Sequence, residues 1–134
     1  MPTVHTFFWL AAQRHYVMHH PADATFLPFP LHFTQWAVAN FVATADELRG
    51  VFGAPHFVED RYDTPGVIED NWAWQLPDGT CLRLVVEVPY DWATVYCDPP
   101  SADRAITALG LSSQCDELKV LPEPVQFIQP GDDA

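Results

Sequence analysis

Apolar and polar residues alternate most clearly over residues 67–88, and this pattern predicts a β-hairpin. Its turn lies at residues 77–79, where proline suits the second position of a type I turn and glycine suits a left-handed backbone. A two-residue turn would direct the apolar sides of the two strands to opposite faces of the sheet. A three-residue turn brings them to one face, so we expect this register: Trp74 opposite Leu82 and Trp72 opposite Leu84.

Other stretches predict three helices and further strands. Apolar residues at helical spacing predict a helix over residues 4–18. Thr44 and Glu47 have the spacing of a capping box, so a short helix is expected to begin there and to end at Gly53. The remaining pattern predicts strands at residues 34–43, 92–97 and 116–128, the last an edge strand broken by prolines, and a short helix at 102–109.

Together these elements predict one α+β domain. We expect an antiparallel meander of four or five strands, packed against an N-terminal helix and two short helices. A chain of 134 residues is typical of a single domain. Within it we distinguish an aromatic, histidine-rich part at residues 1–43, an acidic helix-meander-helix part at 44–128, and a frayed tail at 129–134.

Charge narrows the kinds of partner. The net charge is −12, and residues 1–43 hold one acid, one base and five of the six histidines. A protein binds nucleic acids or anionic membranes largely through its Lys and Arg side chains, so neither is expected as a partner of this acidic chain. A basic protein partner fits the charge, because complementary charge speeds encounter. The alternative is that the charge only keeps the protein soluble.

Apolar runs and cysteines indicate the compartment. No apolar run approaches the roughly 18 residues of a membrane span, and no Lys or Arg precedes the short N-terminal run, as it would in a signal peptide. We therefore expect a cytoplasmic protein. Cys81, Cys97 and Cys115 are widely spaced and odd in number, which favours reduced thiols packed as small apolar groups over disulfides or a catalytic cysteine.

Histidines at the end of the first predicted helix are candidate metal ligands. His15 and His19 are one helical turn apart, and His20 follows directly. Two imidazoles at this spacing are able to share a zinc ion. The alternative is that they are polar residues that close the C-terminus of the helix. Zinc is the one cofactor that the sequence suggests.

Carboxylates are the candidate binding groups. In the expected register Glu69 lies opposite Glu87, and Asp70 lies opposite Val86 on the apolar face. Opposed like charges are destabilising unless a cation intervenes, either Arg61 or Arg83 of this chain or a basic side chain of a partner. A solvated edge or a bulge would also relieve the repulsion. We expect the partner surface to combine acids with an aromatic anchor: Glu59, Asp60, Glu69, Asp70, Glu87, Asp91 and Trp92.

Residues 44–97 also carry a family resemblance. A capped helix ending in Leu-Arg-Gly-Val-Phe-Gly-Ala-Pro (residues 48–55) leads to a tryptophan-rich strand, a Pro-Asp-Gly turn and an apolar strand. This arrangement resembles small acidic α+β proteins of bacteria that act as immunity proteins or toxin inhibitors. The resemblance implies a non-catalytic protein that neutralises a basic protein partner. It assigns no site residue, because such proteins bind through variable surfaces.

Two other functions stay open at this stage. The first is a small metal-dependent enzyme or metal-binding domain that uses the N-terminal histidines. The second is a structural subunit that forms a homodimer through the aromatic residues of the first 43 positions.

Overall fold

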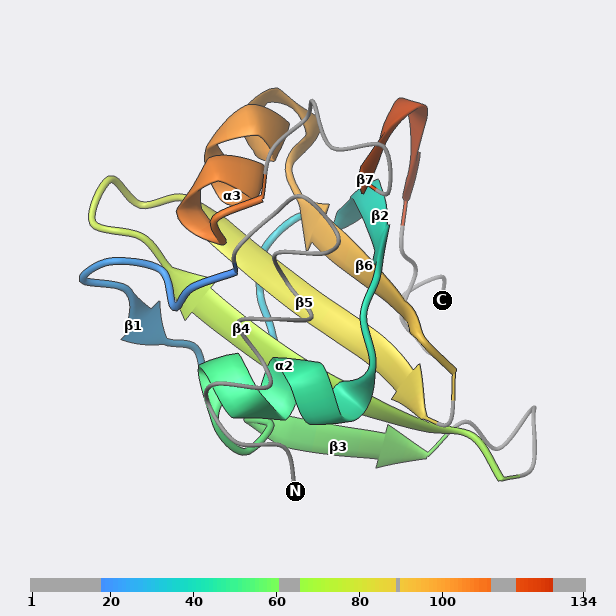
Figure 1. Cartoon of the computed structure of the whole chain (residues 1–134). Helices are drawn as coiled ribbons and strands as arrows, with labels where there is room; N and C mark the ends of the chain where they lie inside the picture. The colour runs from blue at the N-terminus through green and yellow to red at the C-terminus, as the bar shows by residue number, and fades with distance from the viewer. Residues whose placement is uncertain (1–17, 61–65, 89, 112–117, 127–134) are drawn as a thin grey trace, which may run out of the picture.

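A seven-stranded antiparallel sheet forms the centre of the computed structural model, which describes residues 18–60, 66–88, 90–111 and 118–126. The predicted helix over 4–18 lies outside the described residues apart from Met18. The strands run in the spatial order β1-β4-β5-β6-β2-β7, and β3 pairs with the same outer edge of β4 as β1 (Figure 1). Their bounds are Thr25–Phe26 (β1), Trp36–Val42 (β2), Phe57–Asp60 (β3), Ile68–Gln75 (β4), Cys81–Val88 (β5), Trp92–Cys97 (β6) and Leu118–Gln126 (β7).

The expected four or five strands were too few. The α+β class and the antiparallel sheet are confirmed, but β1 and β3 were not expected. They have two and four residues, too short to show an alternating pattern. Both form because β4 has backbone groups along its outer edge that need hydrogen-bond partners.

The β4–β5 hairpin has the expected register. Trp74 lies opposite Leu82 and Trp72 opposite Leu84, so both apolar sides share one face. The Leu76 N–H donates to the Thr80 carbonyl at 2.7 Å, which leaves residues 77–79 as the three-residue turn. Gly79 has a φ of 93°, a value that side chains with a Cβ rarely adopt. Turn chemistry and apolar pattern therefore acted together to set this register.

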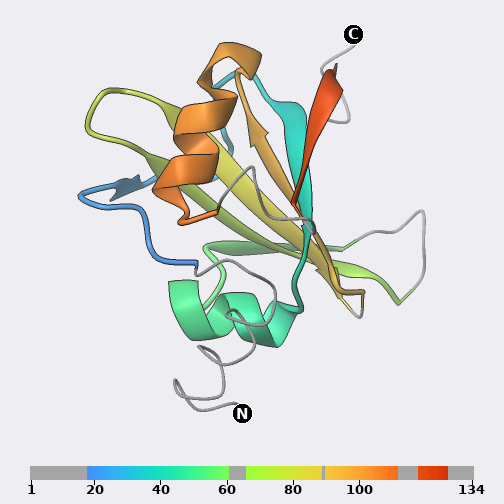
Figure 2. The same ribbon diagram turned by 45° about the horizontal axis from the view of Figure 1, so that its top comes forward.

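Two α-helices lie among the described residues, and both cover the face of the sheet that carries Trp72 and Trp74 (Figures 1 and 2). They are α2 (Ala45–Phe52) and α3 (Ala102–Ala108), the second preceded by the 3₁₀ turn η1 (Pro99–Ser101). We call this side the helix face. The core between it and the helices consists of large apolar side chains: Met18, Val38, Phe41, Leu48, Phe52, Trp72, Trp74, Leu82, Leu84, Val86, Val95, Ile106 and Leu109.

The predicted capping box begins α2. The Glu47 N–H donates to the Thr44 hydroxyl at 3.2 Å, and the Thr44 N–H donates to the Glu47 carboxylate at 3.1 Å. Gly53 ends the helix with a φ of 80°. Leu48 and Phe52, one turn apart, point into the core. The position of α2 over β4 and β5 follows from this buried stripe.

The opposite side of the sheet, which we call the polar face, carries alternate residues of the same strands, including Glu69 and Asn71 of β4 and Arg83 and Glu87 of β5. Residues 27–35, between β1 and β2, pass behind β4 and β5 in Figure 1 and cross one end of this face. Two contacts join this segment to the polar face. Cys81 of β5 lines a pocket together with residues 27–33, and Arg83 of β5 donates a hydrogen bond to Gln35. The other end of the polar face carries the acids. In the part of the chain that the structure describes, neither helix has the length and apolar character needed to cross a membrane.

Candidate functional site

Three glutamates lie side by side across the polar face. Glu59 of β3 is directly opposite Glu69 of β4, which is directly opposite Glu87 of β5. We call these three residues the carboxylate row. Neighbouring strands are about 5 Å apart, so the row places three acids within about 10 Å. All three side chains are half-buried.

Trp92 extends the row. The last recorded pair between β5 and β6 joins Val86 to Ala93, so one further step along the strands brings Trp92 beside Glu87. Trp92 is 41% exposed, and Tyr90, just before it, is 53% exposed. The row therefore ends in a tryptophan whose side chain is partly buried and partly open to solvent.

Arg83 is the buried cation of this face. Its Nε donates to Asn71 Oδ1 at 2.8 Å and its Nη1 donates to Gln35 Oε1 at 3.0 Å, while its guanidinium carbon lies 5.2 Å from the centre of the Tyr96 ring. Only 2% of the residue is exposed. Burial lowers the pKa of Arg83, and the charges of Glu59, Tyr96 and Glu69 act against that shift. The buried guanidinium therefore interacts electrostatically with two acids of the row, Glu59 and Glu69.

The residues expected at the partner surface fall into three groups. Glu59, Glu69, Glu87 and Trp92 form the row described above. Asp60 and Asp91 are exposed at its two ends, on β3 and just before β6. Asp70 lies elsewhere: it is fully buried on the helix face and receives two hydrogen bonds from Arg49, at 2.8 and 3.0 Å.

His19 and His20 are both committed to local hydrogen bonds. The Nδ1–H of His19 donates to the His20 carbonyl, and that of His20 donates to the Pro21 carbonyl. The remaining ring nitrogen of His20 accepts the indole N–H of Trp74 at 3.2 Å. His15 lies outside the described residues. Within the described ranges, no three His, Cys, Asp or Glu side chains gather as metal ligands.

Two of the cysteines are described, and burial makes both poor nucleophiles. Cys81 lies on the polar face, opposite to the face of Trp72 and Trp74 as expected, and burial raises the pKa of its thiol. Burial raises the pKa of Cys97 to about 12, with the charge of Asp98 adding to the shift. The thiolate is the reactive form of cysteine, and a raised pKa reduces its share. A catalytic cysteine has instead an electropositive setting that lowers its pKa.

A cleft of about 890 Å³ separates the β4–β5 turn from α3. Its walls are mostly apolar, with His19 and Thr107 among the polar residues. No local pattern in the sequence indicates this cleft, since its lining comes from three separate stretches of chain. Three charged residues line it, and two of them, Asp78 of the turn and Arg104 of α3, form an exposed ion pair at 2.7 Å; the third is Asp103.

Sequence reasoning found the members of the carboxylate row but missed the groups that hold it in place. Arg83 was expected only as a nearby cation, whereas it is buried and bonded to Asn71 and Gln35. Comparison of the chain with known proteins finds no match, whether among protein-family models, curated proteins or solved structures.

Proposed function

We propose that this protein is a non-catalytic binding module that holds a basic protein partner on its carboxylate row, with Trp92 as the apolar anchor. It is of the immunity or inhibitor type that the resemblance of residues 44–97 implies. The observation that carries the proposal is the alignment of Glu59, Glu69 and Glu87 in one row that ends at a half-exposed tryptophan.

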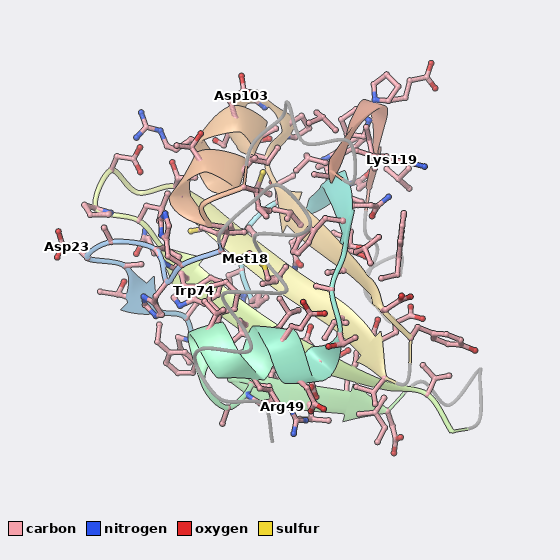
Figure 3. The ribbon with its side chains drawn as sticks, viewed as in Figure 1. Met18, Asp23, Arg49, Trp74, Asp103 and Lys119 are labelled. Atoms are coloured by element: carbon pink, nitrogen blue, oxygen red, sulfur yellow. The ribbon has the colours of Figure 1, made fainter. Side chains whose placement is uncertain are left out.

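Repulsion within the row favours a cationic partner. Like charges directly opposed on neighbouring strands cost free energy, and each added cation between them recovers part of it. Among the described residues, the buried guanidinium of Arg83 interacts electrostatically with Glu59 and Glu69 of the row. Lys119 of β7 lies at the opposite edge of the sheet (Figure 3). A partner's Arg or Lys side chains therefore gain by lying across the row.

Trp92 supplies apolar contact area, which the carboxylates do not. Aromatic side chains that bury a large apolar area at the centre of an interface contribute much of its binding free energy. Trp92 is already packed against the sheet, so little side-chain entropy is lost when a partner covers it. Asp60 and Asp91, exposed at the two ends, act on the rate of encounter.

Photo-crosslinking from chosen positions of this chain identifies the partner, and a binding measurement then gives its affinity. A photo-crosslinking amino acid at position 92 is compared in cells with one at Asp103, which lies on the outside of α3 (Figure 3). We expect a basic protein to crosslink at 92 and not at 103. The affinity of that protein is then measured at low and high salt.

Matched double variants separate the row from overall charge. Glu59→Gln with Glu87→Gln and Asp23→Asn with Glu123→Gln each remove two negative charges from a total of −12. We expect the first pair to weaken binding about tenfold or more and to flatten its salt dependence. The second pair should change affinity by less than about threefold. Equal losses from both pairs would show that net charge, and not the row, attracts the partner.

A further inference from the structure

His56 joins two short strands on the outer edge of β4. β1 pairs with Trp74 and Gln75, and β3 pairs with residues 68–71 of the same edge. This arrangement leaves Trp72 and Ala73 at a gap between the two strands. His56, which directly precedes β3, lies at this gap.

Both the backbone and the ring of His56 bond to β4. Its N–H donates to the Asn71 carbonyl at 2.7 Å, and its Nδ1 accepts the N–H of Ala73 at 2.9 Å. The Ala73 carbonyl accepts the N–H of Leu27, just after β1, at 3.0 Å. An imidazole nitrogen thus takes the place of a backbone carbonyl in the ladder of the sheet.

This bond exists only with a neutral ring. The Ala73 amide can only donate, so Nδ1 must present its lone pair, and the ring proton must be on Nε2. A protonated ring carries hydrogen on both nitrogens. Two N–H groups would then face each other, and the partly buried amide of Ala73 would lose its acceptor.

The surroundings of His56 oppose its protonation. Its ring meets Phe26 edge-on, with ring centres 4.2 Å apart, and Trp74 edge-on at 5.4 Å. Neither β1 nor residues 71–75 of β4 offer a titratable side chain. Among the described residues, the titratable group whose charge acts on it is His20, which packs against the same indole of Trp74. Burial, the largest cause, lowers the pKa of His56; the Ala73 backbone acts in the opposite direction, and the charge of His20 adds to the lowering.

We propose that His56 makes the attachment of β1 to the sheet pH-sensitive: when its ring takes up a proton, β1 and the segment that follows it separate from the outer edge of β4. Phe26 leaves with β1, since its ring rests on that of His56. The result is a newly open strand edge on β4 at residues 73–75.

The direction of the effect follows from proton uptake. The attached state holds His56 with a lowered pKa, whereas the detached state leaves it near the ordinary value of about 6.5. The detached state therefore binds more protons as the pH falls below about 6.5. One proton shifts the equilibrium by at most about tenfold per pH unit, and the shift stops growing below the pKa of the attached state.

Amide hydrogen exchange of the full chain, followed by NMR, tests this. The Leu27 amide reports on the attachment of β1 to β4, and the Leu84 and Val95 amides in the β5–β6 pair serve as internal references. Between pH 7.5 and 5.5 we expect protection of Leu27 to fall about tenfold relative to the references. His56→Asn, which keeps an acceptor at the place of Nδ1 but does not titrate, should abolish this change.

His32→Asn, an exchange of an exposed histidine in the segment after β1, should behave like the wild type. His20→Asn should also keep the pH dependence. The proposal is overturned if Leu27 protection does not depend on pH, or if the dependence survives in His56→Asn or is lost only in His20→Asn. Wild-type spectra give an independent check, because the Ala73 amide must shift together with the His56 ring signals. An Ala73 amide that stays constant while His56 titrates would overturn it even if no variant folds.

Discussion

The guanidinium group of Arg49, on α2, donates two hydrogen bonds to the buried carboxylate of Asp70, on β4. The Nε–Oδ2 distance is 2.8 Å and the Nη2–Oδ1 distance is 3.0 Å. Asp70 is fully buried, whereas the Arg49 side chain is 48% exposed. The pair therefore joins a helix to the sheet at the border of the core (Figure 3 labels Arg49 there). A buried carboxylate keeps its charge at low cost only while this partner is present.

Removing Arg49 should destabilise the protein. Loss of one partner of a fully buried ion pair costs about 3–5 kcal/mol, and because Arg49 is half-exposed we expect about 2–3 kcal/mol for Arg49→Met. In an Asp70→Asn background the same substitution should cost clearly less, since no buried charge is left behind. Urea denaturation of the four proteins measures both effects. Equal losses in the two backgrounds would mean that the ion pair does not stabilise this contact.

Exchanging Arg83 for lysine should destabilise the polar face although the charge is kept. A lysine ammonium cannot reproduce the planar fork that reaches Asn71 and Gln35 together, so one buried acceptor is left without its donor. We expect Arg83→Lys to cost about 1–3 kcal/mol in urea denaturation. The matched control is Arg104→Lys on α3, where the arginine is mostly exposed, and it should change stability by less than about 0.5 kcal/mol. A comparable loss in both variants would contradict the buried network.

Cys97 should be nearly inert toward thiol reagents in the folded protein. With a pKa of about 12, only about one thiol in 10⁴ is ionised at pH 8. In a Cys115→Ser background, we expect Cys81 to react with a disulfide reagent first and Cys97 to react only after urea unfolds the chain. Raising the pH toward 10 should speed any reaction of native Cys97, because the thiolate fraction rises about tenfold per unit. Fast modification of Cys97 at pH 8 would show that the end of β6 opens readily.

The hairpin and both described helices were predictable because their signals are local. The register of β4 and β5 needed only the alternating pattern and a turn that accepts Pro77 and Gly79. The beginning of α2 needed only Thr44 and Glu47. Each of these features depends on residues that are close in the sequence, so the pattern along the chain contains the information.

The site was only partly predictable because it depends on contacts between distant segments. The register correctly placed Glu69 opposite Glu87, but Glu59 entered the row through β3, a strand with no alternating pattern of its own. The same register placed Asp70 opposite Val86 on the apolar face, yet its partner Arg49 depends on how α2 docks. His56 gave no sequence signal, since its role arises from a gap between two edge strands.

The spatial position of β2 has a consequence for how the chain reaches this structure. β2 lies between β6 and β7, so a strand synthesised early has both of its neighbours in the last third of the chain. On the ribosome, β2 leaves the exit tunnel well before any partner strand exists, whereas β4, β5 and β6 are able to pair with the segment just before them. Because closing long loops costs more entropy than closing short ones, we expect the β4–β5–β6 meander to form first and β2 to join it late. Pulse-labelled hydrogen exchange during refolding would then protect Leu84 amides before those of Phe41, and the half-finished sheet would present an unpaired edge of β6 until β2 arrives.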